Sequence, residues 1–281
     1  MTLTLDRKQV TDLEDTRLHW TQWGERGPRV LLIHAIGFDH RTWEPVIPFL
    51  KDDYRLVALD LPGHGESDKP ATADYSLPAL GRRVIRFLDE LEWEDAILVG
   101  NSLGGGTSLA ATLQAPDRVK GLALLNSVGL RPGLPLVGRL AFLPLVALVT
   151  GYTPAPVMRL GLECARCGWG SVTADRGAYS SRYLRSIEGR AAFFGTLKKL
   201  YGTDLDEMAA HYQEIRCPTV VLHGERDPLI RLSHAERLAE AIPPAELVRL
   251  PRCGHFPQEE QPEKVAAELR KFLSRACEQR S

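Results

Sequence analysis

Residues 96–106 have the sequence Ala-Ile-Leu-Val-Gly-Asn-Ser-Leu-Gly-Gly-Gly, which indicates the fold of the chain more clearly than any other stretch. The apolar run from Ala96 to Val99 predicts a buried strand, and the small residues after Leu103 are compatible with a helix. Ser102 lies between two glycines in the spacing G-x-S-x-G, which is typical of a serine at the tip of a sharp strand-to-helix turn. Glycine suits both flanks because it has no Cβ and lets neighbouring chains approach closely. The helix would aim free N–H groups and its positive end at the serine hydroxyl, so Ser102 is the predicted nucleophile.

Strand and helix patterns alternate on both sides of this stretch. Further strands are predicted at 16–23, 30–33, 55–59, 121–125, 219–222 and 247–250. Helices are predicted at 43–51, 77–91, 103–114, 232–241 and 262–276. This alternation predicts an α/β fold, with a mostly parallel sheet covered by helices on both faces. Right-handed crossovers then bring the carboxyl ends of the strands to one edge, where ligands bind.

The alternation stops between Gly129 and about Ala210, where no strand pattern is visible. We therefore expect a core domain of residues 1–128 and 211–281, with residues 129–210 forming an inserted helical cap over the strand ends. Leu134 to Val149 is strongly apolar, but it falls short of the roughly 20 residues that a membrane span needs. It is expected to form an apolar cap wall facing a hydrophobic substrate, and docking of this wall on a membrane surface is left open.

Composition narrows the class of protein. The chain has 281 residues, of which 44% are hydrophobic and 25% charged, and its formal net charge is −1. Such a balance indicates a soluble enzyme and gives no general attraction to nucleic acid or anionic membranes. The N-terminal residues lack an apolar run long enough for a signal peptide, and an odd count of five cysteines is not a disulfide framework. A cytoplasmic location is expected. The sequence predicts no particular oligomer.

A serine nucleophile needs a base and an orienting acid, because a free hydroxyl attacks poorly. His255 follows the last predicted strand and precedes the last helix, so its loop can reach the strand-end edge where Ser102 lies. Asp227 lies in the loop after the preceding strand, where a carboxylate would hold the other ring nitrogen of His255. Glu225 is the nearest alternative acid. The strand before the insertion ends in Asn126 and offers no carboxylate.

The remaining histidines divide by position. Three follow predicted strands or stand in glycine-rich loops and could lie near the same edge: His34, His64 and His223. The other four are expected at the surface or in loops: His19, His40, His211 and His234.

Two main-chain N–H groups are needed to stabilise the oxyanion of an acyl intermediate. Leu103 offers one at the start of the helix after Ser102. The loop after an early strand should supply the other, and we assign it to Ile36, with Ala35 as the alternative.

The chain resembles the α/β-hydrolase fold superfamily over nearly its whole length. The matching segments are His34-Ala35-Ile36-Gly37 with Trp43, Asp60-Leu61-Pro62-Gly63-His64-Gly65-Glu66-Ser67, Gly100-Asn101-Ser102-Leu103-Gly104-Gly105, His223-Gly224-Glu225-Arg226-Asp227 and Gly254-His255. One difference is Ala35, where the family usually has glycine. A serine at position 102 argues against the dehalogenase and epoxide-hydrolase branches, which have aspartate there. The resemblance implies a Ser102–His255–Asp227 triad that hydrolyses an acyl compound, most commonly an ester or lactone.

The substrate remains open between several branches. The elbow Gly-Asn-Ser-Leu-Gly-Gly resembles that of C–C bond hydrolases acting on ring-opened aromatic diketones. In that branch Asn101 and the cap arginines Arg182, Arg185 and Arg190 would bind a substrate carboxylate or dienolate. Phe256, where that branch usually has tryptophan, is also predicted to contact substrate. Solvated arginines, a haloperoxidase or perhydrolase activity, and a ligand receptor with a vestigial triad are the alternatives.

No metal and no cofactor are expected. Cys164 and Cys167 form a C-x-x-C pair, but the chain has no second pair to complete a zinc site. The Gly104–Gly106 run lacks the lysine of a phosphate-binding loop.

Overall fold

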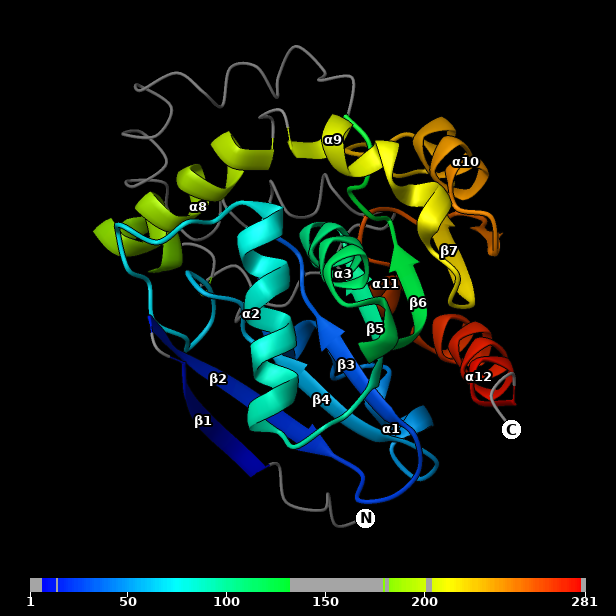
Figure 1. Ribbon diagram of the computed structural model, residues 1–281, viewed down its shortest axis with the longest axis horizontal. Helices are drawn as coiled ribbons and strands as arrows, with labels where there is room; N and C mark the ends of the chain where they lie inside the picture. Colours follow the sequence, from blue (N-terminus) through cyan, green and yellow to red (C-terminus); the bar gives the residue numbers. More distant parts are fainter. Residues whose placement is uncertain (1–6, 14, 132–178, 180–181, 201–203, 279–281) are drawn as a thin grey trace.

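The computed structural model describes residues 7–13, 15–131, 179, 182–200 and 204–278, and within them one eight-stranded sheet forms the centre (Figure 1). Its strands are β1 (Arg7–Leu13), β2 (Thr16–Trp23), β3 (Arg29–Ile33), β4 (Arg55–Leu59), β5 (Ala96–Asn101), β6 (Val119–Leu125), β7 (Thr219–Gly224) and β8 (Ala245–Leu250). They lie in the order β1-β2-β4-β3-β5-β6-β7-β8. The β1–β2 and β2–β4 pairs are antiparallel, and every other pair is parallel. The α/β fold class is therefore confirmed.

The central strands are apolar throughout because both of their faces are covered. In β3, Leu31 and Ile33 pack into the core on one face, while Val30 and Leu32 pack into the core on the other. This alternation is the two-residue period of a strand, and it explains why a parallel strand appears as a continuous hydrophobic run.

The seven predicted strands are present, and β1 was missed. β1 pairs with β2 alone, at the edge of the sheet. Its Val10 side chain is exposed, whereas Leu13 reaches the core. A half-covered edge strand lacks the hydrophobic run on which the prediction of the other strands rested.

Helices cover the two faces of the sheet. One face carries α2 (Leu77–Glu90), α3 (Leu103–Gln114) and α10 (Leu232–Ala241), and the other carries α1 (Ile47–Leu50) and α12 (Pro262–Glu278). Short helical segments lie in the connections between these elements: η1 (His40–Trp43), η2 (Pro116–Arg118), η3 (Tyr212–Glu214) and α11 (Pro257–Glu260). The predicted helix at 43–51 is in fact split into η1 and α1.

Part of the predicted cap is described. Helix α8 (Ile187–Leu200) and helix α9 (Asp204–Ala210) lie on the side of the sheet toward which β3, β5 and β6 point (Figure 1). The Tyr183 hydroxyl donates to the carbonyl of Gly63 at 2.9 Å, and a Cβ on Gly37 would lie 3.2 Å from the Phe193 ring. The segment from 182 to 200 therefore touches the loops after β4 and β3.

The predicted apolar wall at 134–149 and the Cys164–Cys167 pair lie outside the described residues. The cap boundaries at 129 and 210 remain a prediction.

Among the helices that the structure describes, none combines the length and apolar character needed to cross a bilayer.

Candidate active site

Ser102 joins β5 to α3 in a strained backbone conformation. Its φ of 54° and ψ of −112° lie outside the regions that non-glycine residues favour, at a cost on the order of 1–3 kcal/mol. Main-chain hydrogen bonds hold this conformation: the Ser102 N–H donates to Leu125, and the Ser102 carbonyl accepts from Gly105, Gly106 and Val128. The strand–turn–helix geometry predicted from G-x-S-x-G is present.

The two flanking glycines are required by close contacts. A Cβ on Gly100 would lie 2.3 Å from the carbonyl oxygen of Gly104, and a Cβ on Gly104 would lie 2.1 Å from that of Ile33. Both neighbours are main-chain atoms that cannot rotate away, so a side chain at either position would displace the turn.

His255 and Asp227 form a buried hydrogen-bonded pair. The His255 Nδ1–H donates to Asp227 Oδ2 at 2.7 Å, and Asp227 Oδ1 accepts from the N–H groups of Leu229 at 2.7 Å and Ile230 at 3.0 Å. Burial alone would raise the pKa of Asp227, but the charge of His255 and the accepted hydrogen bonds lower it below 3.8. Asp227 is therefore ionised at neutral pH and fixes the proton of His255 on Nδ1.

Asn101, the residue before Ser102, is hydrogen-bonded to the loop that carries His255. Its amide N–H groups donate to the carbonyls of Leu125 at 3.0 Å and His255 at 3.2 Å, and its oxygen accepts from Gln258 at 3.2 Å. The side chain is fully buried. The predicted substrate contact by Asn101 is not supported, because its polar atoms are already bonded inside the protein.

The loop after β3 is held by His34. Its Nε2 accepts from the Leu61 N–H at 2.9 Å, so its Nδ1 carries the proton and donates to the Ala35 carbonyl at 2.7 Å. Burial lowers the pKa of His34, which keeps the ring neutral and this tautomer in place. Ile36 follows in this loop, while Leu103 begins α3, where the first N–H groups have no partner within the helix. Their joint role as oxyanion donors remains a prediction.

Of the other residues predicted to contact substrate, two arginines are exposed, while Arg190 and Phe256 contact other parts of the protein. Arg182 and Arg185 are exposed, whereas Arg190 donates to the carbonyls of Leu184 at 3.0 Å and Arg185 at 2.8 Å. Arg190 thereby caps the preceding helical turn. Phe256 is only 3% exposed and packs with Ala35 and Phe38 behind the loop that carries Ile36.

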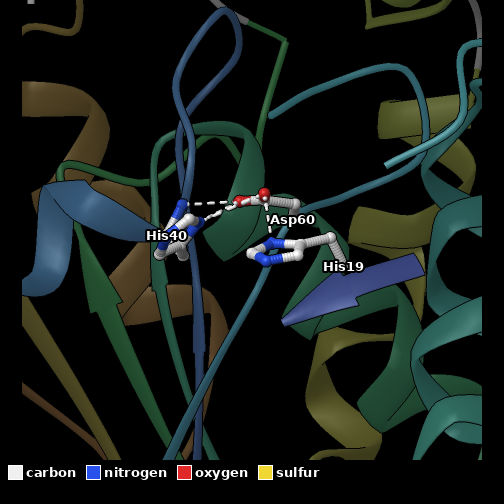
Figure 2. Close-up of side chains that lie close together, drawn as sticks. All are labelled: His19, His40 and Asp60. Atoms are coloured by element: carbon white, nitrogen blue, oxygen red, sulfur yellow. Dashed lines mark hydrogen bonds and ion pairs between the residues drawn. The ribbon is translucent and has the colours of Figure 1, made fainter. Parts of the chain in front are cut away.

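His19 and His40 are buried, contrary to the expectation of surface positions. Figure 2 shows both rings turned toward Asp60, with His19 Nδ1 2.9 Å from Oδ2 and His40 Nδ1 3.0 Å from Oδ1. Burial alone would lower the pKa of His40, but the hydrogen bond and charge of Asp60 raise it above 6.5. The antiparallel register of β2 and β4 brings residue 19 beside residue 60, a signal that single-strand patterns do not contain.

The trio of His19, His40 and Asp60 is the group of described residues whose donor atoms lie close enough together, within 4.8 Å, to hold a metal ion. The residues do not fit that role well. The main-chain N–H groups of His40 and Glu66 also donate to the two Asp60 oxygens, at 2.6 and 2.9 Å. A cation would have to displace ring protons and face these N–H groups. We assign the trio to holding β2 and the loops after β3 and β4 together.

His234 is also buried, while His211 is exposed as expected. His223 lies beneath the loop of Asp227 and donates from Nε2 to the Ile230 carbonyl at 3.0 Å. His64 packs between His34 and Tyr183, with ring centroids 5.3 and 5.7 Å apart. The His223 and His64 rings therefore contact loops at the strand-end edge.

Comparisons with known proteins agree with this architecture. Residues 30–268 match the profile of the Alpha/beta hydrolase family. The chain is 32% identical over 256 residues to 2-hydroxymuconate semialdehyde hydrolase of Pseudomonas sp. strain CF600, covering 88% of this chain and 87% of that protein.

Solved structures of three differently named hydrolases superpose on the chain. A meta-cleavage product hydrolase, CumD, superposes with a TM-score of 0.82 and 28% identity, covering 95% of this chain and 98% of that one. An N-acyl homoserine lactone degrading enzyme has a TM-score of 0.78 and 26% identity, covering 94% of this chain and 100% of that one. A membrane phospholipase A has a TM-score of 0.85 and 25% identity, covering 97% of this chain and 87% of that one. Because the family profile matches residues 30–268, which is most of its length, the chain belongs to the alpha/beta hydrolase family.

Proposed function

We propose that the protein is a serine hydrolase that cleaves a carboxylic ester or lactone of a small hydrophobic acyl compound. The main support is the Asp227–His255 pair at 2.7 Å, together with the bond from Asn101, the residue before Ser102, to the His255 carbonyl. Similarity to a lactone-degrading enzyme and to a phospholipase supports an acyl substrate.

In the proposed mechanism, His255 takes the Ser102 proton on Nε2 as Oγ attacks the substrate carbonyl. The carbonyl electron pair moves to oxygen, where the N–H groups of Ile36 and Leu103 stabilise the negative charge. The intermediate collapses, the bond to the leaving alcohol breaks, and His255 donates its proton to that oxygen. Water activated by His255 then hydrolyses the acyl-enzyme. Asp227 stays ionised throughout and stabilises the imidazolium.

The test is the hydrolysis of p-nitrophenyl butyrate by Ser102→Ala. Turnover should fall to background, because no other group supplies the acyl acceptor. Ser108→Ala is the matched control, since Ser108 is buried in the helix that follows Ser102 and its hydroxyl donates to the Gly104 carbonyl at 2.8 Å. His255→Ala should also fail to react with a fluorophosphonate probe. Wild-type rates in Ser102→Ala would refute the proposal.

C–C bond hydrolysis of a ring-opened aromatic diketone is the second candidate. It is favoured by the named relatives, which include 2-hydroxymuconate semialdehyde hydrolase at 32% identity and 2-hydroxy-6-oxo-2,4-heptadienoate hydrolase of Pseudomonas putida at 32% identity. A panel of esters, lactones and ring-opened dienoic diketones separates the two candidates. If the diketones are turned over, Arg182→Gln and Arg185→Gln should raise KM for these anionic substrates and leave KM for neutral esters unchanged.

A further inference from the structure

Asn126 is the first residue after β6, and its backbone is strained. Its φ is 43°, in the left-handed region that asparagine tolerates better than most non-glycine residues. Its N–H donates to the Leu222 carbonyl at 2.9 Å, which continues the pairing of β6 with β7 beyond the strand. The side chain is completely buried. Strain and burial together show that the position of this side chain is tightly determined.

The Asn126 amide contacts three separate parts of the site. Its Nδ2 donates to Asp227 Oδ2 at 2.6 Å and to the Gly254 carbonyl at 3.1 Å, and its Oδ1 accepts from the Gly224 N–H at 3.2 Å. A carboxylate and a carbonyl can only accept, and an N–H can only donate. The orientation of the amide is therefore determined by its partners, and a flipped amide would lose all three bonds.

Asn126 and His255 donate hydrogen bonds to the same oxygen of Asp227. Asp227 Oδ2 accepts from Asn126 and from His255 Nδ1, while the other oxygen accepts from Leu229 and Ile230. Gly254, the second acceptor of Asn126, immediately precedes His255 in the chain. One side chain thus holds both the acid and the loop that carries the base.

From this geometry we infer that Asn126 is a positioning residue, which holds the Asp227 carboxylate and the His255 loop in the arrangement needed for proton transfer from Ser102. This inference rests on the proposed serine hydrolase function. Asn126 does not touch the reacting atoms and acts through Asp227. The hydrogen bond that it donates also favours the ionised form of Asp227.

The first experiment measures kcat and KM for p-nitrophenyl butyrate in Asn126→Ala. Loss of a hydrogen bond to a charged group should lower kcat about tenfold to a hundredfold, with little change in KM. Thr112→Ala is the control, because Thr112 is also buried and loses one hydrogen bond, from its Oγ1 to the Ser108 carbonyl at 2.8 Å, in which Asp227 takes no part. The control should keep wild-type kcat.

The second experiment repeats Asn126→Ala in an Asp227→Asn background, with the rate of fluorophosphonate labelling of Ser102 as readout. If Asn126 acts through the Asp227 carboxylate, its removal should cost about threefold or less there, because coupled residues are not additive. An equal cost in both backgrounds would show a purely structural role and overturn the inference. A Ser102→Ala protein that still turned over the ester would instead refute the underlying function.

The isosteric variant Asn126→Asp tests the inference without leaving a cavity. It replaces the Nδ2 donor with a carboxyl oxygen 2.6 Å from Asp227 Oδ2 and 3.1 Å from the Gly254 carbonyl, so the two carboxyl groups share one proton and no donor is left for Gly254. We expect kcat to fall at neutral pH because the His255 loop loses its bond, and to fall further as rising pH removes the shared proton and the two carboxylates repel. A wild-type kcat across the pH range would overturn the inference.

Discussion

The glycines that follow Ser102 should respond differently to a single added methyl group, although all are at the start of one helix. A Cβ on Gly105 would lie 2.0 Å from Ser127 Oγ and 2.6 Å from Ser127 Cβ. Ser127 cannot move freely, because it is 2% exposed and its hydroxyl donates to the Val128 carbonyl at 2.7 Å. In Gly105→Ala, overpacking of about 1–3 kcal/mol and a lost hydrogen bond of about 1 kcal/mol oppose a helix-propensity gain of about 1 kcal/mol.

The expected net loss in the free energy of unfolding is therefore about 1–3 kcal/mol, which lowers Tm by about 3–10 °C. Urea and thermal denaturation of four proteins measure it: wild type, Gly105→Ala, Ser127→Gly and the double variant. Since Ser127→Gly removes both clashing atoms, Gly105→Ala should cost little in that background. Gly106→Ala is the control, because its nearest contacts are Leu77 methyl groups at 3.1 and 3.2 Å that can shift. Equal costs of Gly105→Ala in both backgrounds would refute the reasoning.

Three further substitutions test the buried rings and the cap contact. Because Asp60 raises the pKa of His40 above 6.5, the stabilisation from their pair is complete below pH 6.5 and is lost as pH rises through the folded-state pKa. His40→Gln should thus destabilise more at pH 6 than at pH 9 in urea denaturation, and a pH-independent cost would contradict this assignment. Burial lowers the pKa of His64 to about 3, so wild type should lose stability as pH falls from 6.5 toward 3. His64→Gln should lose less over that range, and parallel acid-unfolding curves would be the contrary result. Tyr183→Phe removes the bond to the Gly63 carbonyl and should increase proteolytic cleavage at 182–200 while Tm falls by only a few degrees, whereas unchanged cleavage would show that this bond does not hold the segment.

The sheet was largely predictable because its central strands are buried on both faces. A run as apolar as Val30 to Ile33 is stable as a strand only where both of its faces are covered, and this favours a central position in the sheet. β1 was not predictable in this way, because Val10 faces solvent and the strand is stabilised by pairing with β2. Its existence depends on a partner strand rather than on its own sequence.

The strand ends in the sequence predict the loops that carry Ser102, Asp227 and His255, and Asp227 and His255 do lie within hydrogen-bond distance. The sequence does not predict the residues that support these loops, because hydrogen-bond partners far apart in the chain leave no local pattern. In the sequence, Asn126 indicates only that this strand end has no carboxylate, yet its side chain donates to Asp227 at 2.6 Å. Asn101 was expected to face substrate, yet its amide is used between loops. In a sequence, an asparagine that faces substrate cannot be told from one that bonds loops together, and only the fold distinguishes the two.

Helix α8 packs against two loops that are far apart in the sequence, the loop after β3 and the loop after β4. Phe193 rests against Gly37, and Ala192 approaches so closely that a Cβ on Gly63 would lie 2.8 Å from it. Any movement of α8 away from these glycines would therefore remove the packing of the loops after β3 and β4 in the same step.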